Sequence, residues 1–323
     1  MGSHVRPGSH RRSIRASLLH AMRIESLDGI TGRFRHVFLS PHLDDVVYSC
    51  GGTLSVLARR GERPLVVTVF AGEPSPGTPL TDAAVAKHRR MGMADPHDVR
   101  SAMALRRRED GTALERCGAD HLWLDHVDAI YRGTPPSYPR RELYLGGDVH
   151  PSDRATLHEI TTELLGVHRR LPGINWYAPL GVGRHVDHQL VHSAASRLAC
   201  VRASVSFYED FPYVTDERSL GRRLEETAAS LEPSLLVIGE QLRIRTEASR
   251  AYRSQLVGNF GTEAAFEATF GTYPRSLHAD RTLAVERYWR CRTTERRSHE
   301  GGCHRDQRRP EPQLRERTPV HGS

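Results

Sequence analysis

The sequence predicts an α/β protein with a mostly parallel sheet, and two of its features carry that prediction. Short apolar runs of strand length alternate along the chain with longer segments whose apolar residues recur at helical spacing, as in repeated strand–helix units. The runs are apolar throughout rather than alternating, as at 65–70, which is typical of parallel strands covered by helices on both faces. The length of 323 residues and the 38% apolar content allow one large domain with an ample core.

The first strand–helix–strand unit shows the pattern in detail. Residues 35–40 form a short apolar run that fits a buried strand, and Pro41 ends it. Apolar residues then recur at helical spacing over 46–60, and Gly61 follows, as glycine commonly does after a helix. Residues 65–70 supply the second strand. The ordered part of the chain therefore opens with one βαβ unit.

The alternation continues through the next part of the chain. We expect helices over 96–117, 152–170 and 187–198, and strands over 121–124, 174–178 and 203–208. Ser152 fits the N-cap of the second of these helices. Residues 71–95 and 131–151 have loop composition, and we place the second loop over the active face, because long loops in compact domains are often functional. Beyond residue 215 the pattern becomes helix-rich, ending at 284–289.

These elements predict a Rossmann-like fold, in which helices sandwich the sheet and ligands bind at the carboxyl ends of the strands. We expect a single catalytic domain over 34–290. Residues 1–33 are rich in Gly, Ser, His and Arg and predict a flexible leader, whereas residues 291–323 predict a disordered polar tail.

The net charge of +7 comes from the two ends of the chain. Residues 1–20 carry +4 and residues 291–323 carry +3, so the segment between them is neutral. Proteins that bind nucleic acid usually concentrate basic charge on a folded face, so we expect no nucleic-acid partner. The chain has no run of ~18 apolar residues and no secretory signal, and its five cysteines are widely spaced without a CxxC pair. These features predict a cytoplasmic protein with no membrane partner, disulfide framework or zinc-finger module.

Two polar clusters directly follow the first and fourth predicted strands, at 40–45 and 183–188. Because the carboxyl ends of parallel strands meet at one edge of a sheet, we expect the clusters to bring three histidines and three aspartates together. These residues are His42, Asp44, Asp45, His185, Asp187 and His188.

That set suits a catalytic zinc, which takes three nitrogen or oxygen ligands and keeps one position open for water. Of the neighbouring Asp44 and Asp45, one can bind the metal while the other takes the proton of the water. The alternative for Asp45 is that it only caps the following helix.

The two clusters resemble the paired motifs of the PIG-L/LmbE-like zinc-dependent N-deacetylases. The first motif is His42-Leu43-Asp44-Asp45 followed by Cys50-Gly51-Gly52-Thr53-Leu54, and the second is His185-Val186-Asp187-His188. The resemblance also covers 108–124 and extends over about 34–290. Leu43 stands where the family usually has Pro, and Val46 where it usually has Glu. Neither position is a ligand in the family.

The resemblance implies a role for each site residue. His42, Asp45 and His188 would bind Zn²⁺, with Fe²⁺ as the other candidate metal, and Asp44 would be the general base. A protonated His185 would stabilise the oxyanion or protonate the leaving amine. Asp187 would not bind the metal itself but would adjust the properties of a histidine through a contact with its ring.

The resemblance further implies a hydrolase that removes an N-acetyl or other N-acyl group from a small molecule containing an amino sugar. We expect a place in bacterial antibiotic or specialised-metabolite biosynthesis. Two alternatives remain at this point: an amidase of thiol–sugar conjugates, and a catalytically silent protein that binds a small molecule. The presence of Asp44 and of all three ligands argues against the silent protein.

Overall fold

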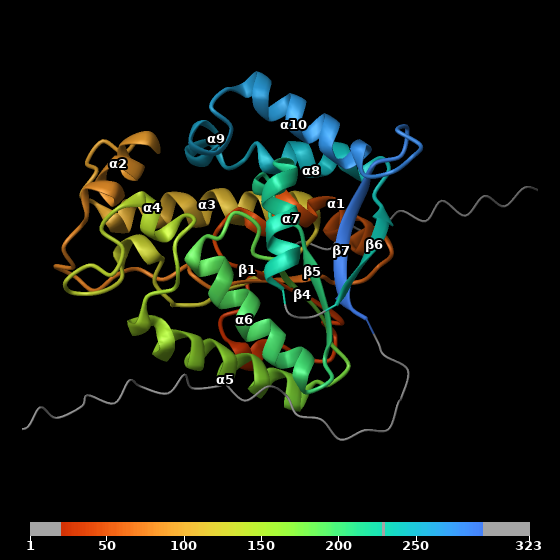
Figure 1. The fold of residues 1–323 in the computed structure, drawn as a ribbon, viewed down its shortest axis with the longest axis horizontal. Coiled ribbons are helices and arrows are strands. Elements are labelled where there is room, and N and C mark those ends of the chain that lie inside the picture. The colour runs from red at the N-terminus through yellow and green to blue at the C-terminus, as the bar shows by residue number, and fades with distance from the viewer. Residues whose placement is uncertain (1–20, 228–229, 293–323) are drawn as a thin grey trace, which may run out of the picture. The chain divides into compact units, whose positions relative to one another are not determined.

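The computed structural model describes residues 21–227 and 230–292, which form a seven-stranded sheet in the order β3-β2-β1-β4-β5-β7-β6 (Figure 1). The strands are β1 (His36–Ser40), β2 (Leu65–Thr68), β3 (Asp120–Trp123), β4 (Asn175–Pro179), β5 (Ser204–Tyr208), β6 (Leu231–Val237) and β7 (Val285–Cys291). Strands β1 to β5 are parallel, and β7 runs antiparallel to both β5 and β6. The predicted α/β fold with a mostly parallel sheet is confirmed.

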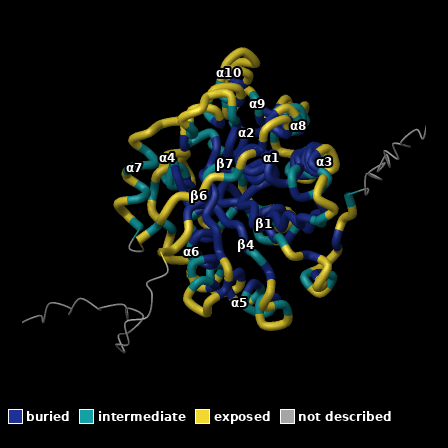
Figure 2. The backbone as a smooth tube through the Cα atoms, turned by 90° about the vertical axis from the view of Figure 1, so that its right-hand side faces the viewer, coloured by how far each residue is buried: buried dark blue, intermediate teal, exposed yellow. Residues whose placement is uncertain are grey.

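Helices cover both faces of this sheet, as the two views of the backbone show (Figures 1 and 2). One layer contains α1 (Asp45–Arg59), α3 (Val99–Cys117) and α8 (Gln241–Ser249), which contact one another. The opposite layer contains α5 (Arg154–Arg170) and α6 (Val186–Cys200), which pack side by side. The other α-helices are α2 (Asp82–Arg90), α4 (Arg141–Tyr144), α7 (Glu217–Glu226), α9 (Arg253–Phe260) and α10 (Glu263–Ser276).

Helix α1 lies in the deepest part of this arrangement, between the sheet and α8. A Cβ at Gly51 would lie 3.1 Å from Arg245 Cγ, and one at Gly52 would lie 2.7 Å from Ile238 Cδ1. The glycine pair therefore lets neighbouring segments approach the α1 backbone closely. In the space beside it, the buried Glu286 carboxylate of β7 accepts the N–H groups of Gly52 at 3.0 Å and Thr53 at 2.9 Å.

Three local predictions differ from the structure. The predicted loop at 71–95 contains helix α2, which begins after a Thr81 N-cap. Ser152 caps no α-helix but lies inside the 3₁₀ helix Pro151–Asp153 that precedes α5. The helix-rich prediction beyond 215 misses β6 and β7. Pro233 lies inside β6, and proline is tolerated there because β6 is the edge strand.

The predicted leader also differs where the structure describes it, over 21–33. Ile24 and Ile30 are buried, and the Ile24 N–H donates to the His121 carbonyl at 2.7 Å. These residues therefore pack on the domain rather than forming a free leader. Residues 1–20 and nearly all of the predicted tail lie outside the described residues. None of the described helices combines the length and apolar character needed to cross a membrane.

Candidate active site

The loop between β1 and α1 is held in shape by hydrogen bonds among its own residues. Ser40 Oγ donates to the His42 carbonyl at 2.6 Å and accepts the Val46 N–H at 3.2 Å. The His42 N–H donates to Asp45 Oδ2 at 2.8 Å. These bonds turn the chain at the carboxyl end of β1 and bury His42, Asp44 and Asp45 together.

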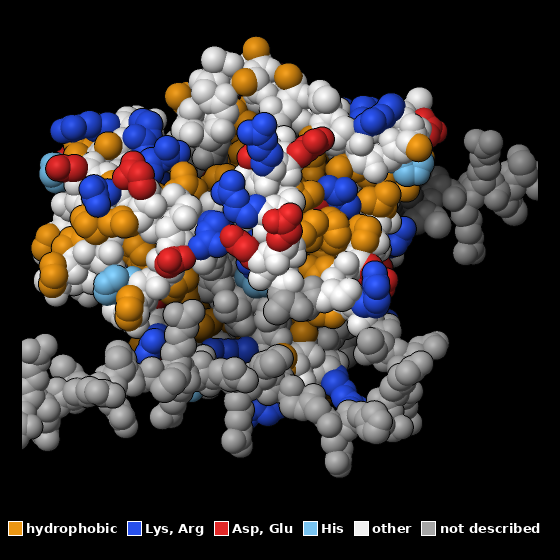
Figure 3. All heavy atoms as spheres, in the orientation of Figure 1, with side chains coloured by type: hydrophobic (Ala, Val, Ile, Leu, Met, Phe, Trp, Pro, Cys, Tyr) orange, Lys and Arg blue, Asp and Glu red, His pale blue; other side chains and the backbone are white. Residues whose placement is uncertain are grey.

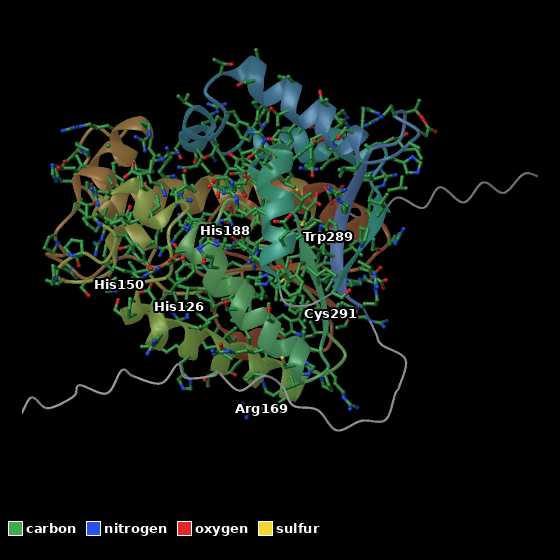
Figure 4. The ribbon with its side chains drawn as sticks, in the orientation of Figure 1. His126, His150, Arg169, His188, Trp289 and Cys291 are labelled. Carbon is green, nitrogen blue, oxygen red and sulfur yellow. The ribbon has the colours of Figure 1, made fainter. Side chains whose placement is uncertain are left out.

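The loop between β4 and α6 brings the second cluster beside the first, because β1 and β4 are neighbours in the sheet. Gly183 has a φ of +81°, and a Cβ there would lie 2.6 Å from Tyr213 Cγ, so this turn requires glycine. His185 is the N-cap of α6, and its Nδ1 accepts the Asp187 N–H at 3.2 Å. His188 follows near the start of α6 in the interior of the molecule (Figure 4).

Two of the predicted metal ligands, His42 and His188, face a carboxylate oxygen of the third, Asp45. Asp45 Oδ2 lies 3.3 Å from His42 Nδ1 and 3.3 Å from His188 Nε2. In a tetrahedral zinc site with bonds of about 2.0–2.1 Å, two ligand atoms are separated by about 3.4 Å. Each of these two distances fits a pair of ligands on one metal ion.

The other ring nitrogen of each histidine contacts a carboxylate. His42 Nε2 lies 2.9 Å from Asp187 Oδ2, and His188 Nδ1 lies 2.6 Å from Asp210 Oδ1. Histidines that bind metals usually donate their second N–H to such a carboxylate, which fixes the orientation of the ring. The two carboxylates thus leave His42 Nδ1 and His188 Nε2 free to face Asp45.

Two other groups of three donors share histidines with this set, and neither of them includes Asp45. Ring nitrogens of His42, His185 and His188 lie within 4.8 Å of one another, and so do donor atoms of His42, Asp128 and Asp187. The buried cluster of histidines and aspartates could hold a metal ion. It offers more ligand sets than the sequence motifs alone predict.

The electrostatics of the cluster favour a bound cation. Burial alone disfavours a charged imidazole, but Asp128, Asp187 and Asp45 outweigh it and raise the pKa of His42 to about 9. For His188, burial is likewise outweighed by Asp45 and Asp210, which raise its pKa well above the usual range. Carboxylates that hold a proton on a histidine this strongly would also stabilise a metal ion, which competes with that proton.

Asp44 has the properties of a base that works near neutral pH. Burial and the adjacent charge of Asp45 raise the pKa of Asp44 to about 7, while Arg106 opposes this rise. Arg106 Nη2 lies 3.8 Å from Asp44 Oδ1, and both side chains are buried. The two neighbouring aspartates thus differ in environment, because Asp45 faces two histidines and its pKa is lowered well below the usual range despite burial.

His185 differs from the expectation that it is protonated. Burial, followed by the charge of His42, lowers the pKa of His185 well below its usual range. Its Nδ1 accepts a backbone N–H, which places the proton of the neutral ring on Nε2. This environment favours the neutral ring over the cation. A neutral N–H can still donate to a developing oxyanion.

Several charged residues around the cluster were not predicted from the sequence. Asp128 is fully buried, and its Oδ2 lies 3.3 Å from Lys87 Nζ and 3.5 Å from Arg106 Nη1. Asp210 accepts the N–H groups of Gly181 and Val182 in addition to facing His188. Asp128 follows β3 and Asp210 follows β5, so their positions after strands of the same sheet were the signal that could have identified them.

A pocket of about 360 Å³ opens above the cluster. His42, Asp44, Asp45 and His185 lie among its lining residues, while α2, α4 and α9 contribute to its walls. Four aromatic side chains also line it: Tyr48, Tyr144, Phe211 and Tyr213. Phe211 and Tyr213 come from the segment that follows β5, and the loop at 131–151 contributes Arg141, Tyr144 and Leu145.

Known proteins resemble this chain in sequence. Residues 37–199 match the family described as PIG-L, GlcNAc-PI de-N-acetylase. A 2'-N-acetylparomamine deacetylase of Niallia circulans is 32% identical over 245 residues, which cover 71% of this chain and 83% of that protein. A 2'-N-acetylparomamine deacetylase of Streptomyces fradiae is 30% identical and is covered over 74% of its length.

Solved structures of deacetylases also resemble this chain. The zinc-inhibited form of a teicoplanin deacetylase superposes with a TM-score of 0.67 at 28% identity, covering 79% of this chain and 97% of that one. A deacetylase of the A40926 pseudoaglycone superposes with a TM-score of 0.62 at 25% identity, covering 80% and 96%. The chain belongs to the PIG-L/LmbE-like family, and it is an N-deacetylase, an enzyme that hydrolyses an amide bond.

Proposed function

We propose that this chain is a zinc-dependent enzyme that removes the N-acetyl group from an amino sugar of an antibiotic precursor. The observation that carries the proposal is the convergence of His42 Nδ1 and His188 Nε2 on Asp45 Oδ2, at 3.3 Å each, beside a second carboxylate in a pocket. The relatives point to the substrate class, because their names describe deacetylation of paromamine, teicoplanin and A40926 compounds.

His42, Asp45 and His188 are the proposed metal ligands. Two imidazoles with one carboxylate are a common catalytic zinc set, and Fe²⁺ can take the same donors. When bound there, zinc would lower the pKa of a water to about 7 and polarise the amide carbonyl. Asp187 and Asp210 orient the two histidine rings through the ring nitrogens that do not face Asp45.

Asp44 is the proposed general base. Its carboxylate lines the pocket and its pKa of about 7 leaves a substantial fraction ionised near neutral pH. It would accept the proton of the attacking water and then deliver that proton to the leaving amine. Arg106 keeps this carboxylate from becoming still more basic.

His185 is the proposed donor to the amide oxygen. Its Nε2–H is the free polar atom of the ring, since Nδ1 is engaged by the Asp187 N–H. A neutral donor stabilises the negative charge that develops on the oxygen without requiring a protonation step first. Tyr144 and Tyr213 would pack against the sugar ring.

Acetate release from purified protein tests the proposal. The substrates are 2'-N-acetylparomamine and the methyl glycoside of N-acetylglucosamine, with zinc content measured on the same samples. We expect about one zinc per chain and acetate release from at least one substrate. Asp44→Asn is the matched control, because it should keep the zinc and lose the activity. Zinc-loaded protein that releases no acetate from any N-acetylated amino sugar would exclude the proposed substrate class.

A further inference from the structure

The mouth of the pocket carries two arginines from separate helices. Arg90 is the last residue of α2 and Arg141 the first of α4, and both line the pocket with largely exposed side chains. Neither takes part in an ion pair or a side-chain hydrogen bond with any residue in 21–227 or 230–292. In Figure 3, basic side chains gather on the part of the surface where α2 and α4 lie.

The two cations deeper in the pocket are different, because carboxylates compensate both. Lys87 Nζ lies 3.3 Å from Asp128 Oδ2, and Arg106 contacts both Asp128 and Asp44. The carboxylates that line the pocket are Asp44 and Asp45, and both lie at its floor. Within the part of the chain that the structure describes, the positive charge at the mouth therefore has no carboxylate partner.

Tyr144 relates the two arginines to one another. Burial and the charge of Asp128 raise the pKa of Tyr144, and Glu142 adds to the rise, while the positive charges of Arg141 and Arg90 oppose it. Both guanidinium groups thus lie close enough to act on the same phenol, which itself lines the pocket. Glu142 follows Arg141 in α4 and is exposed, but it is not among the residues that line the pocket.

We propose that Arg90 and Arg141 bind an anionic group, a carboxylate or a phosphate, on the part of the substrate outside the reacting amino sugar. The proposal rests on the proposed function for the position of that sugar over Asp44 and His185. Guanidinium groups form paired hydrogen bonds with carboxylates and phosphates. Two uncompensated cations at the mouth also attract an anion before it is bound and repel a substrate that carries ammonium groups.

A positively charged mouth would distinguish among possible substrates by their charge. 2'-N-acetylparomamine carries free amines and is cationic at neutral pH, so the mouth of this pocket would disfavour it. We therefore expect this chain to prefer an anionic substrate over 2'-N-acetylparomamine, in spite of 32% identity to a 2'-N-acetylparomamine deacetylase.

The chain offers matched controls for both arginines. Arg89 and Arg140 are the sequence neighbours of Arg90 and Arg141, and both are exposed. Neither lines the pocket. The variant Arg90→Gln/Arg141→Gln and the control Arg89→Gln/Arg140→Gln therefore change the net charge equally, and only the first changes the mouth of the pocket.

The kinetic test compares four substrates: the neutral methyl glycoside of N-acetylglucosamine, N-acetylglucosamine 1-phosphate, the methyl glycoside of 2-acetamido-2-deoxyglucuronic acid, and cationic 2'-N-acetylparomamine. We expect the wild type to have a higher kcat/KM for one or both anionic substrates than for the neutral one. In Arg90→Gln/Arg141→Gln the ratio of anionic to neutral kcat/KM should fall about 5- to 30-fold, mainly through KM, which is the effect of losing two exposed charge pairs. The two anionic arms show whether a phosphate or a carboxylate is preferred.

Two outcomes would overturn the inference: a wild type that prefers the cationic substrate, or an equal fall of the ratio in the Arg89→Gln/Arg140→Gln control. Added salt provides a further check, because the preference should shrink between 0.05 and 0.5 M NaCl as charges are screened, roughly as the Debye length shortens. A calorimetric titration of the zinc-loaded protein with glucosamine 1-phosphate decides the matter even if no substrate is turned over. Absence of turnover on all substrates would then count against the proposed function alone, whereas equal binding by wild type and Arg90→Gln/Arg141→Gln would count against the mouth arginines.

Discussion

The floor and the mouth of the pocket are built in different ways. The floor consists of side chains that follow β1, β3, β4 and β5, and its His and Asp residues are buried and contact one another. The mouth is formed by α2, α4 and α9, where Arg90 and Arg141 are largely exposed and Val257 is 62% exposed. Buried, hydrogen-bonded groups on strand ends hold a fixed geometry, as a reaction requires, whereas exposed helix ends can vary without disturbing it. We therefore expect the floor to carry out the reaction and the mouth to select the substrate.

The floor depends on carboxylates that each bond to several neighbours. Asp210 accepts the Gly181 N–H at 2.7 Å while facing His188, and Asp187 accepts the Ala129 N–H at 3.0 Å while facing His42. The mouth has fewer such ties. Helix α9 is held near its start by Glu109 of α3, which accepts the Ser254 N–H at 2.9 Å and its hydroxyl at 2.6 Å.

The largest effect should come from a metal ligand at the floor. His188→Ala should lose bound zinc and lower turnover by more than roughly 10⁴-fold, because the activation of water and of the carbonyl disappear together. Zinc content by elemental analysis and acetate release measure both effects. His192→Ala is the control, since His192 lies one turn further along α6 and its Nδ1 bonds the Pro179 carbonyl. Unchanged zinc content in His188→Ala would remove His188 from the ligand set.

Asp44→Asn should separate metal binding from proton transfer. We expect zinc content near that of the wild type and a loss of roughly 10²–10⁴-fold in turnover, the usual contribution of a positioned general base. Asp45→Asn should lose both the zinc and the activity. If the two variants behave alike in both assays, the division of roles between the neighbouring aspartates is wrong.

His185→Ala should keep its zinc and lose roughly 10²–10³-fold in kcat, the usual contribution of one donor to an oxyanion. The result also tests the donor group of His42, His185 and His188, because a loss of zinc would make His185 a ligand. Near-normal kcat with full zinc content would exclude the donor role.

Arg106→Gln should shift the pH dependence rather than abolish activity. Arg106 opposes the raised pKa of Asp44, so removing its charge should raise that pKa further, by about one unit. Asp44 must be ionised to act as a base, and activity is lost as the pH falls through its pKa. The acid limb of kcat/KM should therefore move to higher pH. Arg108→Gln, an exposed change on the same helix, should leave the limb in place, and thermal unfolding of both variants checks that they are folded.

The smallest effect should come from the mouth. Glu109→Gln weakens the attachment of α9 and should raise KM about 5-fold with kcat within about 2-fold, since one hydrogen bond contributes about 1 kcal/mol. The exposed Glu115→Gln on α3 is the control. A fall in kcat as large as that of His185→Ala would mean that the mouth takes part in the chemistry and that the floor and the mouth do not divide the work.

Much of the floor was predictable from the sequence, because its signals are local. The apolar run of β1 stops at Ser40, and the reactive side chains of His42, Asp44 and Asp45 follow directly. This pattern indicates the end of a strand that carries catalytic residues, and the segment 183–188 shows the same pattern. Parallel strands place such ends at one edge. The charge state of His185 was not predictable, because it depends on burial and on His42, whose ring centroid lies 4.7 Å away.

The sequence by itself determined the parallel α/β sheet and the six side chains at the ends of β1 and β4, because hydrophobic periodicity and short motifs are properties of neighbouring residues. Only the tertiary structure decided which distant residues surround them. Asp128 and Asp210 face His42 and His188 across gaps in sequence that no local pattern spans. In the sequence, nothing distinguishes Arg90 and Arg141 from the other arginines on exposed helices of this chain. They become a pair only because the packing of α2 and α4 places both at the mouth of one pocket, and proximity of this kind is a consequence of the whole fold rather than of any segment.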